Sequence, residues 1–277
     1  MIAFVLSGGA NYGALQAGAL TVLLEKSINP DMLVGTSAGA LNAAWLARDT
    51  SLAGARKLEH LWSEHAPNLY RRSNGVGMLF QLIKGSDGLY SNQPLQRLIT
   101  KLIGPETTFG DLSGPRLYLT AVRLLDGKFY VFGDREDDRL LDGMMSSSAM
   151  TPFLPPWEVN GEAYTDGGLL AYLPLAVAIE HGATEIYAFE IRLPFDQDSP
   201  KGILAQTLHM MSVVVEHQVQ EELAQALANP LVCLHHLTLA PQSDPGMWNF
   251  SDAAAMISDG RRAAQAFLAQ ESVSQRQ

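Results

Sequence analysis

The residue with the clearest chemical signature is Ser37, which stands in the run Gly-Thr-Ser-Ala-Gly at positions 35–39. A short apolar segment precedes this run, and an alanine-rich segment with helical character, 38–48, follows it. We therefore expect a strand, a sharp turn and a helix, with Ser37 at the turn. Gly35 and Gly39 allow the strand and the helix to approach closely. The helix N-terminus favours developing negative charge, so the context predicts a nucleophile, although a bare G-x-S-x-G also occurs as an ordinary tight turn.

A second candidate element is the loop at positions 7–13, which reads Ser-Gly-Gly-Ala-Asn-Tyr-Gly and lies between an apolar run and a helical pattern. Such a loop exposes backbone N–H groups that bind anions. A dinucleotide loop needs glycine where Ala10 stands, and a P-loop needs a lysine beside Ser or Thr. An oxyanion hole needs only two or three N–H groups, which Gly8, Gly9 and Ala10 can supply. Parallel strands end at one edge of a sheet, so we expect this loop beside Ser37.

A serine nucleophile also needs a base within hydrogen-bond reach. None of the seven histidines stands in a glycine-rich loop, and only one strand and one helix precede Ser37, whereas Ser-His-Asp α/β-hydrolases place several strands there. Asp166 follows a short strand and is backed by Gly167 and Gly168, which leave its carboxylate unobstructed. Aspartate, with a reference pKa near ~3.9, is a poor base at neutral pH, but burial raises its basicity. A Ser-Asp dyad is chemically reasonable, while most Asp-Gly-Gly triplets are only turns.

The composition of the chain restricts the classes of molecule that it is expected to bind. The chain has 277 residues, of which 47% are hydrophobic and 17% charged, so it can bury a sizeable core. Its net charge of −10 disfavours nucleic acid and gives no electrostatic attraction to anionic membranes. The first residues carry no basic leader and no stretch reaches the length of a membrane span, so we expect a cytoplasmic protein that allows transient peripheral contact with a membrane. The single cysteine, Cys233, is expected to be a small core residue.

Strands alternating with helices predict a mainly parallel α/β sheet that is covered on both faces. We expect strands at 2–6, 32–34, 116–125, 128–132, 157–164 (as a hairpin), 185–191 and 231–239. We expect helices at 14–26, 38–48, 52–64, 92–103, 175–181, 204–227 and 249–270. Prolines and serines argue against regular structure over most of 144–156, and 73–90 reads as a glycine-punctuated loop with an apolar patch. One domain, 1–270, followed by a polar tail, 271–277, is predicted.

Several of these motifs together resemble the patatin-like phospholipase family, in its bacterial type of acyl hydrolase. The resemblance rests on the glycine loop ending at Gly13, the run around Ser37, Asp166-Gly167-Gly168, and the stretches 14–20 and 147–156, and it covers roughly residues 2–190. It implies a three-layer α/β/α fold and hydrolysis of acyl esters of lipids without a metal or other cofactor. It also implies that Ser37 is the nucleophile, Asp166 its base, and the loop from Gly8 to Gly13 the oxyanion hole.

The first loop departs from the family pattern at two positions. Family members usually carry glycine where Ala10 stands, and often Arg or Lys where Tyr12 stands. Alanine keeps its N–H, so the hole survives if its φ is negative. Loss of the cation makes a neutral acyl ester at least as plausible a substrate as a phospholipid. The departures also motivate an alternative, a catalytically weak or inactive lipid-binding or regulatory protein on the same fold.

Overall fold

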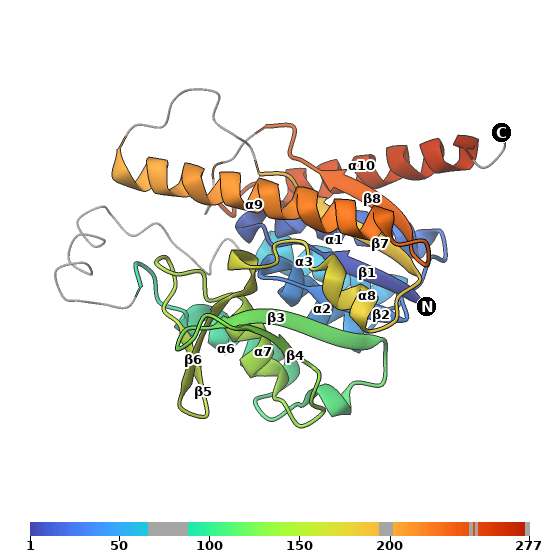
Figure 1. Cartoon of the computed structure of the whole chain (residues 1–277). Helices are drawn as coiled ribbons and strands as arrows, with labels where there is room; N and C mark the ends of the chain where they lie inside the picture. Colours follow the sequence, from blue (N-terminus) through green and yellow to red (C-terminus); the bar gives the residue numbers. More distant parts are fainter. Residues whose placement is uncertain (66–87, 194–201, 244–245, 247–248, 275–277) are drawn as a thin grey trace.

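Eight strands form one mixed sheet in the computed structural model, which describes residues 1–65, 88–193, 202–243, 246 and 249–274 (Figure 1). The strand order is β5-β6-β3-β2-β1-β7-β8, and β4 pairs with β3 outside this path. The strands are β1 Ile2–Leu6, β2 Met32–Gly35, β3 Arg116–Arg123, β4 Phe129–Phe132, β5 Trp157–Val159, β6 Glu162–Asp166, β7 Glu185–Ile191 and β8 Cys233–Leu239.

The sheet has a parallel half and an antiparallel half that share β3. Strands β3, β2, β1, β7 and β8 run parallel, and the loops that follow β1 and β2 therefore leave from the same edge, the carboxyl edge. Strands β4 and β6 pair with β3 in antiparallel fashion, and β5 pairs antiparallel with β6. The continuous apolar run of β1 suits its central place, because a strand in the middle of a parallel sheet is covered on both faces.

Helices cover both faces of the sheet and make three layers. Phe4 and Leu6 of β1 face a core shared with α1, α2, α3, α6, α7 and α10, whereas Ala3 and Val5 face a smaller core under α8 and α9. This alternation follows from the two-residue period of a strand. The helices are α1 Gly13–Glu25, α2 Ala38–Arg48, α3 Leu52–Glu64, α6 Gln93–Ile103, α7 Leu140–Ser147, α8 Leu175–Glu180, α9 Ile203–Ala228 and α10 Ala253–Ser274, with short 3-10 turns η1 Ala10–Tyr12, η2 Phe109–Asp111 and η3 Gly167–Leu169.

The structure confirms the predicted α/β architecture and corrects several details. Residues 144–147 lie in α7, because the serine run ends a helix that is over before Pro152. The prediction that Cys233 is a core residue is wrong: it is exposed at the start of β8, which lies at the edge of the sheet. The last helix continues to Ser274, past the predicted start of the tail at 271. Most of the loop predicted at 73–90 lies outside the described residues.

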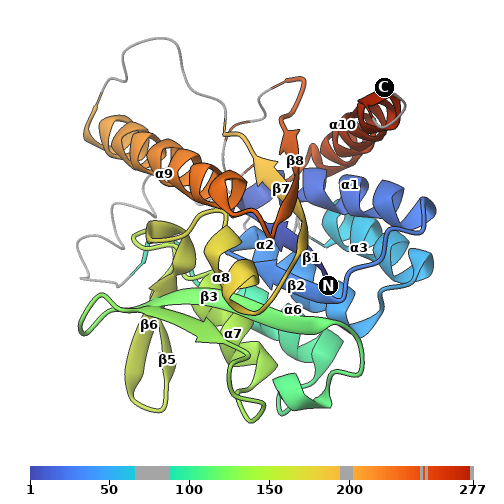
Figure 2. The same cartoon turned by 45° about the vertical axis from the view of Figure 1, so that its right-hand side comes forward.

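Two long helices lie on opposite faces, and one reaches past the sheet. The N-terminal half of α9 extends beyond the carboxyl edge in both views (Figures 1 and 2). Within the described ranges, no helix combines the length and apolar character needed to cross a bilayer.

Candidate active site

Ser37 occupies a strained turn between β2 and α2, as the sequence predicts. Its backbone has φ 56° and ψ −121°, a conformation that costs a non-glycine residue on the order of 1–3 kcal/mol. Neighbouring elements hold it there: the Ser37 N–H donates to Oγ of Ser147 in α7 at 2.9 Å. The hydroxyl of the preceding Thr36 contacts Oγ1 of Thr120 at 2.6 Å and donates to the Ala171 carbonyl at 2.9 Å. The turn is therefore fixed against β3 and the segment after η3.

Close backbone approach explains the glycines beside this turn. A Cβ on Gly39 would lie 2.3 Å from the carbonyl oxygen of Leu6, so α2 packs directly on the end of β1. A Cβ on Gly35 would lie 2.5 Å from the Gly39 carbonyl oxygen. A Cβ on Gly8 would lie 3.5 Å from Cβ of Ser37, which shows that the glycine loop runs next to the serine. The expected juxtaposition of the first two strand ends is thus present.

Asp166 lies at the end of β6 and reaches the same point. It pairs with Ala121 in the register of β3, and its carboxylate accepts the Gly168 N–H at 2.8 Å. The Ser37 side chain lies near enough to interact with this carboxylate. Burial raises the pKa of Asp166 to about 6, while the Ser37 side chain and the Gly168 N–H oppose that rise. The structure therefore brings the two predicted dyad residues together and makes the aspartate a stronger base than it is in water.

The glycine loop differs from the predicted set of donors. The Gly8 N–H donates to the Tyr172 carbonyl at 3.0 Å, so it is already engaged. For the N–H groups of Gly9 and Ala10, the described part of the chain offers no hydrogen-bond partner. Ala10 has φ 48°, contrary to the negative value that the sequence analysis required. Its N–H is nevertheless exposed by the loop, so Gly9 and Ala10 are the donors left for an anion.

The motif glycines Gly13 and Gly167 lie at close contacts with neighbouring segments. Gly13 is the first residue of α1, and a Cβ there would lie 2.6 Å from the Trp62 ring. Gly167 and Gly168 lie in η3, and a Cβ on Gly167 would lie 2.2 Å from Oγ1 of Thr120. These contacts leave no room for a side chain, which explains the residue type without assigning a chemical role.

A buried chain of amide hydrogen bonds supports the glycine loop from below. Trp62 Nε1 donates to Oδ1 of Asn42 at 2.7 Å, and Asn42 Nδ2 donates to Oε1 of Gln16 at 2.9 Å. Gln16 Nε2 in turn donates to the carbonyls of Ser7 at 3.0 Å and Phe189 at 3.2 Å. The ends of β1 and β7 are thereby connected to α1, α2 and α3 through side chains.

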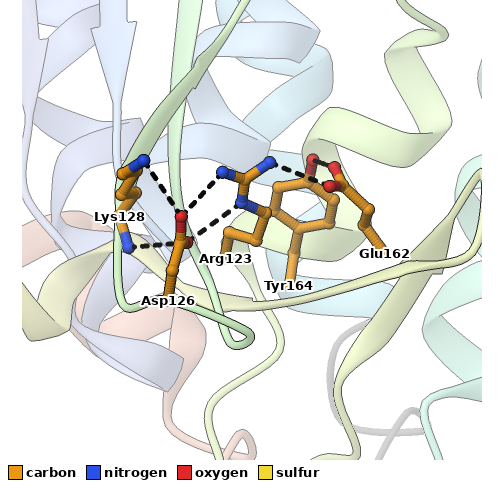
Figure 3. Close-up of polar contacts among 5 residues, drawn as sticks. All are labelled: Arg123, Asp126, Lys128, Glu162 and Tyr164. Atoms are coloured by element: carbon orange, nitrogen blue, oxygen red, sulfur yellow. Dashed lines mark hydrogen bonds and ion pairs between the residues drawn. The ribbon is translucent and has the colours of Figure 1, made fainter.

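The strand that carries Asp166 is held by an ion-pair cluster (Figure 3). Arg123 at the end of β3 donates to Asp126 in the β3–β4 turn at 3.0 and 2.8 Å and to Glu162 of β6 at 2.8 Å. Glu162 also accepts the Tyr164 hydroxyl at 2.9 Å, and Lys128 pairs with Asp126 at 3.2 Å. The cluster, here called the Arg123 clamp, connects the β3–β4 turn to Glu162, the first residue of β6, whereas Asp166 is the last residue of that strand.

Several of the seven histidines contact carboxylates that lie outside the proposed dyad. His181 contacts Asp134 at 2.8 Å, His235 contacts Glu271 at 2.5 Å and His236 contacts Glu190 at 2.6 Å. Each of these rings is thus committed to a carboxylate other than Asp166.

Two residues of the site were missed as contributors in the sequence. Ser147 begins one of the stretches that carry the family resemblance, 147–156, but the sequence gives it no role, whereas in the structure its Oγ accepts the N–H of Ser37. Tyr172 is buried, its ring packs on Gly8, and its hydroxyl donates to the Ile191 carbonyl at 3.0 Å. A serine run at the end of a buried helix was a usable signal for Ser147. No local pattern marks Tyr172, because its contacts lie between segments far apart in sequence.

Sequence comparison identifies the family. The model of the patatin-like phospholipase family matches residues 4–179, and the chain belongs to this family. A cGAMP-activated phospholipase of Escherichia coli (strain TW11681) is 30% identical over 159 residues, covering 54% of this chain and 43% of that protein. The chain thus spans less than half of that relative. The uncharacterized protein YqhO of Bacillus subtilis (strain 168) is 25% identical over 286 residues, covering 96% of this chain and 97% of YqhO.

The fold comparison agrees with this assignment. The crystal structure of VipD from Legionella pneumophila superposes with a TM-score of 0.52 at 14% identity, covering 96% of this chain and 67% of VipD. At this identity the likeness shows the fold alone. The patatin-like, three-layer architecture expected from the motifs is therefore confirmed.

Proposed function

We propose that this chain is a serine acyl hydrolase that cleaves carboxylic ester bonds of lipids through a Ser37–Asp166 dyad. The observation that carries the proposal is the juxtaposition of the Ser37 side chain and the buried Asp166 carboxylate, which come from β2 and β6 on either side of β3. A nucleophile in a strained turn, with a candidate base beside it, fits the arrangement needed for covalent catalysis. Membership of the patatin-like phospholipase family supports the same reaction.

The dyad performs the reaction in two steps. Asp166 accepts the Ser37 proton while Oγ attacks the ester carbonyl carbon, and the Gly9 and Ala10 N–H groups stabilise the resulting oxyanion. Collapse of the intermediate breaks the carbon–oxygen bond, and the proton on Asp166 passes to the leaving alcohol. Water then gives a proton to Asp166 and attacks the acyl-serine, releasing a fatty acid and returning the proton to Ser37. A pKa of about 6 lets Asp166 act as base at neutral pH and hold the proton transiently.

The residues near the loop bear on the class of ester. Tyr12 replaces the cation that is frequent in the family, and its side chain is buried, with 1% exposed. The loop 7–13 itself carries no charged residue. We therefore propose that recognition of the ester depends on the acyl chain and the carbonyl rather than on an anionic headgroup held by this loop.

The proposal is tested by labelling and turnover together. A fluorophosphonate probe is expected to label Ser37, and p-nitrophenyl esters and a panel of phospholipids, lysophospholipids and neutral glycerides are expected to release acid. The Ser37→Ala variant should lose both signals. Ser113→Ala, at an exposed serine outside the helices and strands, is the matched control and should keep them.

Two results would overturn the proposal. Absence of labelling and of turnover on every ester would instead support the lipid-binding alternative, which a copurifying lipid that stays intact over days would strengthen. Persistence of full activity in Asp166→Asn would assign the base to another residue.

A further inference from the structure

The long helix α9 changes character along its length. Its C-terminal half packs into the smaller core through Val219, Leu223 and Ala226, all buried. Its N-terminal half presents apolar side chains to solvent instead: Met210 is 69% exposed and Val213 is 53% exposed. One helix therefore has a half that stabilises the fold and a half whose apolar side chains are not covered by the described residues.

Helix α9 contacts the turn that follows Asp166, and its exposed half projects from that contact. Gln218 Nε2 donates to the Leu169 carbonyl of η3 at 2.7 Å, and η3 begins directly after Asp166. The helix starts at Ile203, fifteen residues before this contact, and a rise of 1.5 Å per residue gives a projection of about 22 Å. Figures 1 and 2 show this part of α9 extending past the edge at which β1 and β2 end. The helix therefore projects on the side of Ser37.

The projecting half has no formal charge. Residues 203–215 contain no Asp, Glu, Lys or Arg, and the first charged residue of the helix is Glu216. A helix that faces water ordinarily carries charged residues on its outer face. An uncharged, apolar surface of this kind is typical of a site of contact with another apolar phase or molecule.

Two further apolar pairs are exposed near the carboxyl edge of the sheet. Leu169 and Leu170, which follow the Asp166 turn, are 44% and 46% exposed. In the β3–β4 turn, Leu124 and Leu125 are 45% and 85% exposed, and the Arg123 clamp holds this turn against β6. The turn carries one lysine and one aspartate, so residues 124–128 have no net charge. We define the apolar rim as these two pairs together with Ile203, Met210, Val213 and Val214, all of which are exposed.

We propose that the apolar rim docks on the surface of a zwitterionic phospholipid bilayer and holds the mouth of the Ser37–Asp166 site against the lipid. The proposal deepens the proposed function and rests on it, because lipid esters must reach Ser37 from a lipid phase. The absence of charge on the helix half and the net charge of −10 favour zwitterionic over anionic headgroups. Binding then depends on burial of apolar area at the boundary between headgroups and acyl chains.

A second copy of the chain is a less suitable occupant. The rim borders the turn that carries Asp166, so a protein partner seated on it would stand at the entrance to the dyad. A bilayer at the same place supplies the ester that the dyad is proposed to cleave. The position of the rim, rather than its apolarity alone, therefore selects lipid.

The test measures binding to phosphatidylcholine vesicles by flotation, in a Ser37→Ala background so that no lipid is consumed. Replacing Met210, Val213 and Val214 together by Gln should weaken partitioning about 100-fold, since three partly exposed apolar side chains no longer enter the lipid. The control replaces Leu227 and Leu231 by Gln. These residues are 71% and 78% exposed at the opposite end of α9, and the change should leave partitioning within about twofold. Replacing part of the phosphatidylcholine by phosphatidylserine should lower the partitioning of the protein without rim substitutions, relative to pure phosphatidylcholine vesicles.

Activity on soluble esters separates this proposal from the proposed function. With Ser37 restored, the triple Gln variant should hydrolyse p-nitrophenyl butyrate at the wild-type rate and lose activity only on vesicles. Wild-type hydrolysis of the soluble ester without vesicle binding would overturn the docking proposal and leave the function standing. Equal partitioning of triple and control variants, or a triple variant that only converts a dimer to a monomer in light scattering, would also overturn it. Vesicle binding with neither ester turnover nor Ser37 labelling would reject the hydrolase and keep the docking surface.

Discussion

The parallel and antiparallel halves of the sheet each deliver one residue of the dyad, and they position it by different means. In the parallel half, Ser37 is fixed by buried backbone packing: α2 lies on the end of β1 at Gly39, and Thr36 is fully buried beneath the turn. In the antiparallel half, Asp166 ends a five-residue strand whose outer side is held by the partly exposed Arg123 clamp. Side-chain ion pairs near solvent tolerate change better than close backbone packing. We therefore expect changes near solvent to reach Asp166 through the start of β6, although the turn directly after Asp166 is itself closely packed at Gly167.

The largest expected effect comes from removing either residue of the dyad. Ser37→Ala and Asp166→Asn should each lower kcat/KM by at least about 1,000-fold, and the double variant should lose little more, because the two residues act as a unit. Steady-state kinetics on a soluble p-nitrophenyl ester measure all three. If the double variant instead lost the product of the two single effects, the two halves would contribute independently and the dyad would be wrong.

The pH dependence should identify the antiparallel half as the source of the titrating group. Because the pKa of Asp166 is raised to about 6, kcat/KM should fall about tenfold per pH unit below that value. Stability should respond in the opposite sense. Between 3.8, the pKa of an unperturbed carboxyl, and about 6, the folded state binds more protons than the unfolded state, so raising the pH across this window lowers the free energy of unfolding.

Asp166→Asn provides the control for both measurements. In thermal melts at pH 5 and pH 8, this variant should lose the part of the pH dependence that is due to the raised pKa and should gain stability relative to wild type at pH 8. An activity profile that stays flat between pH 5 and pH 7 in the wild type would contradict a buried aspartate base.

Weakening the Arg123 clamp should displace the Asp166 carboxylate but leave the position of Ser37 unchanged. Arg123→Gln removes the ion pairs with Asp126 and Glu162, so we expect kcat to fall on the order of tenfold through misplacement of Asp166. Fluorophosphonate labelling of Ser37 should slow by a similar factor, and the midpoint of the pH profile should move. Arg135→Gln, which removes an exposed pair with Asp137, is the matched control and should change neither. Unchanged kinetics in Arg123→Gln would remove the distinction drawn between the two halves.

The smallest expected effect lies in the glycine loop of the parallel half. Ala10 has φ 48°, a region that suits glycine, so Ala10→Gly should raise the free energy of unfolding by about 1 kcal/mol in urea titrations. Ala224→Gly, at an exposed position inside α9, should lower it by about the same amount. A destabilised Ala10→Gly variant would show that the methyl group contributes more by packing than its backbone conformation costs.

The sequence was most informative where local chemistry determines structure. The bounds of β1, α2, α3 and β7 agree with their predicted ranges, because each is a continuous apolar or periodic segment with a clear boundary. The convergence of Ser37, Gly8 and Asp166 was also foreseeable, since it follows from two parallel strand ends and one motif. Their chemical roles stay predictions until tested.

The features that sequence could not provide depend on contacts between distant segments. A β-strand pattern does not tell whether the strand lies at the centre or the edge of a sheet, so the exposure of Cys233 was missed. The sequence also does not show that the Gly8 N–H donates to the carbonyl of Tyr172, a residue far away in the chain. The positive φ of Ala10 could likewise not be predicted from its residue type, because alanine alone favours negative values.

The hydrogen bonds of the buried amide chain all run in one direction, with each donor on the Trp62 side and each acceptor on the side of β1 and β7. Trp62 offers only a donor, so it fixes which end of the Asn42 amide is oxygen, and Asn42 then fixes the orientation of Gln16. The backbone carbonyls of Gly13, Ser7 and Phe189 can only accept, so they require the same orientation of the two amides, and the series is held from both ends without any charge. Replacing the indole by a phenyl ring would therefore leave the Asn42 oxygen without its donor, while both amide nitrogens would still face their carbonyls.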